Sequence, residues 1–507
     1  MTKSMRAWHL ILNIGLGVSL APWTFAAGAH TPHSVQQPDL CNQNKYLRDS
    51  RGDTCGGQAV SLAELVFVLA PEVRGGPLSR RFPKGSRLAR LEPHAHSPHS
   101  LTPGFFTAAD PQTSFDGARI LFAGQKAADS AWQIWEMNVD GTGVRQVTHC
   151  ADDCLKPAYL PRGEIVFTAT SQGPHDSQLW VCKTDGSDSH PITFGPGGFQ
   201  VETVLQNGAI LATARSPLVP SNGLPADRHL YTLRPDGSGL ATLRCDHQHP
   251  ALRSQAKELA DGTVVFVKAP LSSRNQGGDL TWIRRGARHN SPLMAAPVLT
   301  SSPQPINAGE LLVARESTTS PHAVKKLTLY AFDTAKGTFG APLYEDPKLS
   351  SVEAIPVAAH EAPRWYWSTL NPELHRGYFV CMDTYLADSF PHQRIAAKIT
   401  RVRVLTLDSA RQTETTLGEA PVEEDGSFYI AVPPDQPVRF EVLDAAGRVI
   451  RAQRSWIWSR SGEEHGCVGC HEDRSVTPEN RWPLALRRFD TPTLLLGSQQ
   501  KAAGGKH

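Results

Sequence analysis

Two cysteines three positions apart, Cys467 and Cys470, are followed directly by His471 in the stretch EEHGCVGCHEDR. This is the spacing of covalent haem attachment, because two thiols about one turn apart can each add to a vinyl group of the porphyrin. The adjoining imidazole is then held beneath the iron as an axial ligand. Gly469 leaves the backbone free to approach the macrocycle edge. The motif predicts one covalent haem c, bound by Cys467, Cys470 and His471.

Other chemistries of two cysteines fit this stretch less well. A structural zinc site needs a second Cys/His pair at similar spacing, and none follows the motif. A thioredoxin-like redox pair needs a βαβ setting, whereas the surrounding pattern is all-β. Zinc or another metal, and a plain disulfide, remain the weaker alternatives to haem.

The sixth ligand of the predicted haem iron is open. Candidate ligands are His360, His375, His392, His465 and Met382. A histidine would give a low reduction potential and a methionine a higher one. An empty position would permit binding of NO, O₂ or peroxide.

A second group of ligands occurs in LRCDHQHP, where Cys245, His247 and His249 alternate and would share one face of an extended segment. Such ligands suit zinc or copper. The competing interpretation is a polar loop between two repeats. CADDC (150–154) offers Asp152 and Asp153 to a cation on weaker grounds.

The N-terminus has the pattern of an export signal, with Lys3 and Arg6 before an apolar run at 10–20 and small residues at 24–29. We therefore expect a signal peptide over 1–29 and a mature protein in the periplasm or outside the cell. No later segment is apolar enough to span a membrane, so no span is expected in the mature protein. The expected disulfide is Cys41–Cys55; Cys150–Cys154 would close a tight loop.

A repeat runs through the first two thirds of the chain. Five segments have a turn ending in Gly and then an apolar strand: SFDGARILFA (114–123), YLPRGEIVFT (159–168), VLQNGAILAT (204–213), LADGTVVFVK (259–268) and INAGELLVAR (306–315). Strand pairs joined by Asp-Gly follow in phase, as in IWEMNVDGTGVRQVT (134–148). The period near 45 residues predicts a six-bladed β-propeller over 62–350. A large β-sandwich is the alternative.

After a linker at 351–377, alternating apolar residues predict five strands at 378–386, 399–408, 427–432, 438–444 and 448–458. The fold class is therefore all-β: an extension at 30–61, the propeller, and a small sandwich-like haem domain over 378–490, with a flexible tail at 491–507. Lys and Arg (51) nearly balance Asp and Glu (49), which argues against a nucleic-acid partner. RWYWSTL (364–370) is expected to pack at the domain junction.

The run from 417 to 488, with RSW, CVGCHE and PENR in order, resembles the hydrazine synthase alpha subunit family. That resemblance implies a propeller followed by a β-rich haem domain, within a multi-subunit complex that makes hydrazine from nitric oxide and ammonia. This chain departs from the family in having one CxxCH motif where the alpha subunit carries two. The family also has an iron-binding tyrosine four residues after the motif histidine, where this chain has Ser475. Haem attachment is therefore implied, and hydrazine synthesis is not.

Together these features predict an exported monohaem c-type cytochrome that transfers electrons or serves as a redox subunit, with a redox partner protein or other subunits of a complex. A haem enzyme acting on a small nitrogen or oxygen species is the alternative. A third interpretation, a binding protein with a structural or sensory haem, differs in the role of the iron rather than in the fold.

Overall fold

The computed structural model describes residues 64–170, 177–215, 226–243, 250–273, 277–284, 291–294, 298–316, 326–386, 395–408, 413–469 and 481–496. These lie in one compact unit, Val60–His507. Several predicted features lie outside the described residues: the signal peptide, the Cys41–Cys55 pair, the Cys245, His247 and His249 group, His392, Cys470 and His471.

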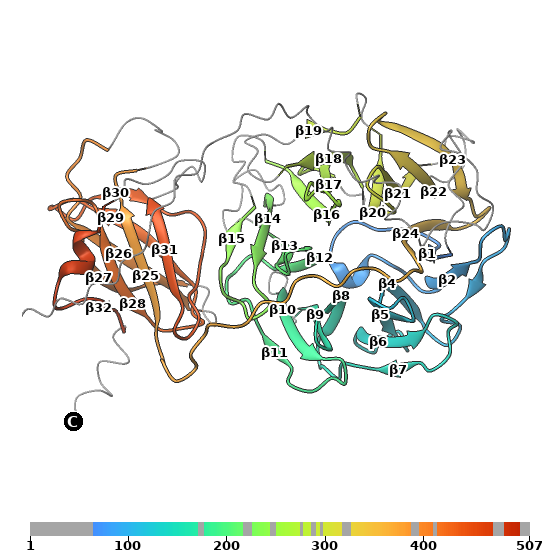
Figure 1. Cartoon of the computed structure of the whole chain (residues 1–507), viewed down its shortest axis with the longest axis horizontal. Coiled ribbons are helices and arrows are strands. Elements are labelled where there is room, and N and C mark those ends of the chain that lie inside the picture. Colours follow the sequence, from blue (N-terminus) through green and yellow to red (C-terminus); the bar gives the residue numbers. More distant parts are fainter. Residues whose placement is uncertain are drawn as a thin grey trace, which may run out of the picture. The chain divides into compact units, whose positions relative to one another are not determined.

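Six four-stranded antiparallel sheets occupy the described residues up to 356. Their innermost strands contact one another in turn and close a ring, so the architecture is a β-propeller (Figure 1). From the inside outward the sheets are β24 (Ser350–Pro356), β1 (Leu65–Ala70), β2 (Arg87–Leu91) and β3 (His99–Ser100); β4 (Thr107–Thr113), β5 (Arg119–Gln125), β6 (Gln133–Asn138) and β7 (Arg145–Gln146); β8 (Asp153–Leu160), β9 (Glu164–Thr170), β10 (Ser177–Lys183) and β11 (His190–Pro191); β12 (Gln200–Val204), β13 (Ile210–Arg215), β14 (Arg228–Leu233) and β15 (Ala241–Thr242); β16 (Leu252–Glu258), β17 (Val264–Ala269), β18 (Asp279–Ile283) and β19 (Ser291–Pro292); and β20 (Thr300–Pro305), β21 (Glu310–Glu316), β22 (Leu327–Asp333) and β23 (Thr338–Tyr344).

The repeated sequence pattern corresponds to fixed places in these sheets. Each apolar segment that follows a Gly turn is the second strand of its sheet, and phenylalanines at equivalent positions, Phe122, Phe167 and Phe266, are fully buried. The Asp-Gly turns at 140–141, 185–186 and 236–237 each join the third strand of a sheet to the fourth. Gly237, for example, has φ +82°, and Asp236 Oδ1 accepts a hydrogen bond from Ser238 N at 3.0 Å. Glycine is required there because other residues are strained at positive φ.

The first sheet is closed by a strand from the far end of the propeller sequence. β24 pairs antiparallel with β1, with Val68 opposite Val352 and Leu65 opposite Pro356. Residues 351–356, which were expected in the linker, are therefore the innermost strand of this sheet. Pairing of the two ends of a propeller removes what would otherwise be two open sheet edges.

A ring of bulges lines the centre of the propeller. Five of the innermost strands contain a residue at positive φ: Asp110, Lys156, Gln255, Ser302 and Glu353. Several of these side chains accept a hydrogen bond from the backbone of the next bulge: Glu353 Oε2 from Asp110 N at 2.8 Å, Asp110 Oδ2 from Lys156 N at 3.1 Å, and Gln255 Oε1 from Ser302 N at 2.8 Å. Neighbouring sheets are thus linked by side-chain hydrogen bonds as well as by apolar packing.

Arg81, which follows a short 3-10 helix (Leu78–Arg80), inserts into this ring and is buried. Its guanidinium donates to Asp110 at 2.7 and 2.8 Å and to Glu353 at 2.9 Å. Burial and the neighbouring Asp110 carboxylate raise the pKa of Glu353 to about 7, against the opposing effect of Arg81.

The C-terminal domain consists of two four-stranded sheets around one apolar cluster that includes Phe379, Val402, Ile430 and Val442. The sheets are β31 (Glu464–Gly469), β25 (Gly377–Asp383), β28 (Phe428–Val432) and β32 (Thr493–Leu494), and β27 (Thr413–Pro421), β26 (Arg401–Asp408), β29 (Val438–Leu443) and β30 (Val449–Ala452). A second 3-10 helix spans Leu484–Arg487.

Three of these strands were not predicted. β27 and β31 lie in stretches taken as connections, and β32 lies in the expected tail, where Leu495 is buried. The predicted strand at 448–458 is shorter, ending at Ala452. Within the described part of the chain, no helix has the length and apolar character needed to cross a membrane.

Candidate haem-attachment site

Cys467 lies on β31, the edge strand of its sheet, which runs parallel to β25. The register places Cys467 beside Cys381 and His465 beside Phe379. Neighbours in register point to the same face, so the side chains of His465 and Cys467 share the face that packs on the domain core. Cys467 is half-buried against that core, and the His465 ring lies 5.4 Å from the ring of Phe379.

The rest of the motif, Cys470 and His471, lies outside the described residues. The described residues on either side of 470–480, Gly469 and Arg481, are both held in place by contacts with the domain. Before it, Gly469 pairs with Asp383 at the end of β25. After it, the Arg481 guanidinium lies 3.5 Å from Asp383 Oδ2 and 3.0 Å from Asp425 Oδ2. The predicted haem-binding segment therefore leaves and rejoins the domain at one place, beside Asp383.

Arg481 also donates to the backbone oxygens of Met382 at 3.3 Å and Asp425 at 2.8 Å. Burial of Asp425 favours its protonated form, but this is outweighed by hydrogen bonds from Ser427 and Leu484 N and by the charge of Arg481, which hold the pKa of Asp425 below its ordinary value. The arginine is thus an ionic and hydrogen-bonded clamp on the exit of the motif.

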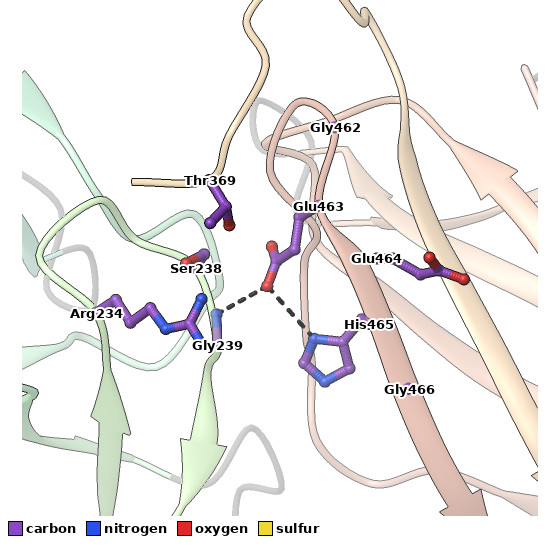
Figure 2. Close-up of a pocket in the computed structure, with 9 residues that line it drawn as sticks. All are labelled: Arg234, Ser238, Gly239, Thr369, Gly462, Glu463, Glu464, His465 and Gly466. Atoms are coloured by element: carbon purple, nitrogen blue, oxygen red, sulfur yellow. Dashed lines mark hydrogen bonds and ion pairs between the residues drawn. The ribbon is translucent and has the colours of Figure 1, made fainter. Parts of the chain in front are cut away.

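The entry to the motif strand is fixed by Glu463. Its Oε1 accepts from Gly239 N at 2.8 Å, its Oε2 accepts from Arg460 N at 2.8 Å, and His465 Nδ1 lies 3.7 Å from Oε1 (Figure 2). Burial alone would raise the pKa of Glu463, yet the hydrogen bonds from His465, Gly239 and Arg460 lower it. The carboxylate therefore stays ionised and lies beside Nδ1 of the imidazole, on the side where carboxylates stand for metal-binding histidines.

Trp458 anchors the same segment in the propeller. Its ring is 1% exposed and lies 5.9 Å from the ring of Phe194 and 5.4 Å from that of Phe199. Its indole N–H donates to Gly237 O at 3.1 Å. The Asp236–Gly237 turn of the fourth sheet, through Gly237 O and Gly239 N, therefore contacts both Trp458 and Glu463.

A pocket of about 500 Å³ lies beside β31, lined by Arg234, Ser238, Gly239, Thr369 and Gly462–Gly466 (Figure 2). Arg234 contributes the cationic group. Within the described residues it has no carboxylate partner, and its guanidinium lies 5.6 Å from the ring centre of Tyr366. The arrangement offers a cation and an imidazole next to the strand that bears Cys467.

The aromatic segment 364–370 lies along the propeller, where Ser368 Oγ donates to Asp236 Oδ2 at 2.7 Å. The Arg162 guanidinium lies 5.0 Å from the ring centre of Trp365 and 4.1 Å from that of Trp367. These contacts place the segment on the propeller, whereas the sequence predicted packing at the domain junction, and Trp367 is 72% exposed.

The other predicted ligands are less well placed. Met382 follows Cys381 on β25 and so points to the face opposite Cys467. His360 and His375 are exposed. Asp153 accepts a hydrogen bond from Trp132 N at 3.0 Å. Among the described residues, no group of three or more His, Cys, Asp or Glu side chains is arranged to hold a metal ion. Of the described sixth-ligand candidates, His465 alone shares the face of Cys467.

Sequence reasoning did not assign roles to Trp458, Glu463, Arg481 or Arg234. The first three lie in RSWIW, EEHG and PENR, stretches close to the motif, so their proximity was the available signal. Arg234 lies more than 200 positions before the motif, and the fold brings it to the pocket.

Comparison with known proteins gave one family match and relatives in sequence and structure. Residues 392–472 match the hydrazine synthase alpha subunit middle domain. Hydrazine synthase subunit alpha of Kuenenia stuttgartiensis is 22% identical over 81% of this chain and 66% of its own length. The chain thus spans 66% of the curated relative that it matches.

Among solved structures, Kuenenia stuttgartiensis hydrazine synthase matches with a TM-score of 0.73 and 21% identity, over 84% of this chain and 71% of that chain. TolB from Acinetobacter baumannii matches with a TM-score of 0.42 and 14% identity, over 58% of this chain and 66% of that one. The resemblance inferred from RSW, CVGCHE and PENR is confirmed: the chain is similar to the hydrazine synthase alpha subunit family in its middle domain, in sequence and in fold.

Proposed function

We propose that this chain is an exported c-type haem protein that transfers electrons as a subunit of a redox complex. In this proposal the six sheets are the six blades of a closed propeller, which holds a sandwich-like haem domain. Cys467 and Cys470 attach the haem, and His471 is its axial ligand.

The described residues fit such a group. Cys467 lies on an edge strand, which pairs along one side only among the described strands. The pocket beside it carries Arg234, a suitable partner for a carboxylate of the macrocycle. His465 has the Glu463 carboxylate 3.7 Å from Nδ1, and its Nε2 would serve as the ligand atom. When bound, haem supplies one-electron chemistry at its iron, with a potential set by axial ligands and surroundings.

The observation that carries the proposal is that the residues on either side of 470–480 are both held beside the same aspartate. Its entry at Gly469 and its exit at Arg481 both lie beside Asp383. Covalent attachment requires the two thiols and the imidazole to be held around one macrocycle, and the fixed positions of Gly469 and Arg481 favour that restraint.

The test is expression of the full chain in a host with cytochrome c maturation, followed by a pyridine haemochrome spectrum of the denatured protein. We expect one covalent haem per chain. Cys467→Ala combined with Cys470→Ala should abolish it, while the matched control Cys182→Ala, in the propeller core, should retain it. Absence of covalent haem from the folded unsubstituted protein would contradict the proposal.

A haem enzyme acting on a small nitrogen or oxygen species is the second candidate, favoured by the pocket of about 500 Å³ beside β31. Electron paramagnetic resonance of the oxidised protein separates the two functions. A low-spin signal that NO or cyanide does not change supports electron transfer. A high-spin signal that shifts when either ligand is added supports the enzyme.

Other subunits are proposed partners, because the relative from Kuenenia stuttgartiensis is named as a subunit of its enzyme. Export is proposed from the N-terminal pattern at 1–29. N-terminal sequencing of the secreted protein should find a start after Ala26, Ala27 or Ala29. A retained Met1 would contradict cleavage.

A further inference from the structure

Two cysteines outside the predicted haem site are held side by side. Cys154 is the second residue of β8, and its N–H donates to Trp132 O at 2.8 Å. The next residue, Gln133, holds Cys150: its Oε1 accepts from Cys150 N at 3.1 Å, and its Nε2 donates to Cys150 O at 2.8 Å. Consecutive residues thus fix both cysteine backbones, and the loop 150–154 is closed by hydrogen bonds.

The two side chains interact directly and differ in character. Contact with the Cys154 side chain lowers the pKa of Cys150 in spite of its partial burial, and the Cys154 thiol also donates to Asp152 O at 3.9 Å within the same loop. The same contact, together with burial, raises the pKa of Cys154. Cys150 is half-buried and Cys154 is fully buried, so an oxidant can reach the first sulfur and not the second.

We propose that Cys150 and Cys154 form a reversible disulfide, a redox site of the propeller that is separate from the haem. Its partner is a disulfide-bearing oxidant, either a small molecule such as glutathione disulfide or a protein. The physiological setting rests on the export proposed above, because disulfides persist in oxidising compartments.

The reaction balances as thiol–disulfide exchange. The Cys150 thiolate attacks one sulfur of the oxidant, the oxidant's S–S bond breaks, and its other half leaves and takes up the proton lost by Cys150. The Cys154 sulfur then attacks Cys150 Sγ in the mixed disulfide, and the second half of the oxidant leaves with the Cys154 proton. Two electrons pass from the cysteine pair to the oxidant, which is reduced to two thiols.

Cys182 provides an internal control. It is buried in the same apolar cluster as Cys154, and burial raises its pKa to about 12. An enclosed, protonated thiol cannot take the first step with an external oxidant, so Cys182 should stay reduced. Cys154 differs because it attacks only the mixed disulfide already formed on Cys150. A disulfide between Cys150 and Cys154 would close a short loop, and a short loop restricts the unfolded chain little. Oxidation should therefore change the free energy of unfolding only slightly, and it is better followed by chemical labelling of the thiols.

The test equilibrates the folded full chain in glutathione buffers from reduced to oxidised, followed by acid quenching, denaturation, alkylation, trypsin and mass spectrometry. Trypsin should release 146–162, which contains Cys150 and Cys154, and 163–183, which contains Cys182, because Lys156 precedes a proline and is not cut. In oxidised buffer we expect 146–162 to carry no alkyl group and to weigh two hydrogens less than the free dithiol peptide. Peptide 163–183 should be alkylated throughout.

Two variants test the order of attack. Cys154→Ser should accumulate glutathione on Cys150, because the resolving thiol is gone, and Cys150→Ser should leave Cys154 alkylated. Full alkylation of 146–162 in oxidised buffer, or equal oxidation of Cys182, would overturn the proposal. The experiment is repeated on the Cys467→Ala, Cys470→Ala chain. A disulfide is expected there too, because this chain lacks only the haem attachment. In the unsubstituted chain, a disulfide without haem contradicts the proposed function alone, and haem without a disulfide contradicts the present proposal alone.

Discussion

Replacing Glu353 by glutamine should change how the stability of the propeller depends on pH. Glu353 lies in the bulge ring, where its carboxylate accepts from Arg81 at 2.9 Å and from Asp110 N at 2.8 Å. Its pKa is raised from 4.5 to about 7 in the folded protein. A raised carboxyl pKa means that the folded state holds the proton more tightly, so its contribution is present at low pH and lost as pH rises toward 7.

The size of the effect follows from linkage. With a pKa of 4.5 in the unfolded chain and about 7 in the folded one, this group should lower the free energy of unfolding by about 2.5 kcal/mol between pH 5 and pH 8. Glutamine cannot titrate and should remove this slope. It also loses one acceptor, which costs about 1–3 kcal/mol at pH 5, where the wild-type group is protonated. The two proteins should therefore converge in stability near pH 8.

The assay is urea unfolding of wild type and Glu353→Gln at several pH values from 5 to 8, at constant ionic strength. The matched control is Glu72→Gln, which removes an exposed carboxylate paired with Arg74. The difference between wild type and Glu353→Gln should shrink with pH, and the control difference should stay flat. Parallel pH profiles for wild type and Glu353→Gln would refute the assignment of a raised pKa to this buried carboxyl.

Three further substitutions test the haem-attachment site. Trp458→Ala should cost about 3–5 kcal/mol and speed proteolysis of the linker 357–376, whereas the exposed Trp367→Ala should do neither. Arg481→Ala should lower the haem content measured by haemochrome while the exposed-pair variant Arg488→Ala keeps it; equal content would contradict the clamp. Glu463→Gln should shift the haem reduction potential in voltammetry, relative to Glu464→Gln, if Glu463 orients a ligating His465; unchanged potentials would exclude that role.

The sequence was sufficient for the propeller because its local signals are strong. Asp236–Gly237 and its equivalents require a turn with positive φ, and the strand segments that follow Gly turns contain fully buried residues such as Phe122 and Phe167. Each signal lies within about ten residues and is repeated along the chain, so the errors of one copy are corrected by the others.

The elements that were missed are defined by distant partners. β24 (Ser350–Pro356) becomes the innermost strand through pairing with β1, and nothing in SSVEAIP identifies that partner. β27 (Thr413–Pro421) is largely exposed and lacks an apolar alternation, and β31 (Glu464–Gly469) contains two glycines. Edge strands are specified by the sheet that they join more than by their own composition.

The candidate site also has a part that the sequence predicts and a part that only the fold reveals. The spacing of Cys467, Cys470 and His471 predicts the chemistry directly, because covalent haem attachment is a local requirement. The supporting contacts are non-local: Arg234 and Gly239 come from the fourth sheet, and Asp383 and Asp425 from the C-terminal domain. Only the fold brings them to the motif.

Closure of the first sheet by β24 also dictates an order of events during synthesis. β1 is the first described strand, and all six of its residues, LVFVLA, are buried. Its partner β24 emerges from the ribosome some 280 residues later. Until then the nascent chain carries an apolar, β-prone segment with an unpaired edge, the kind of segment that seeds aggregation. A factor that shields this segment until residue 356 has been made would protect the chain, and it would act before Cys467 and Cys470 exist.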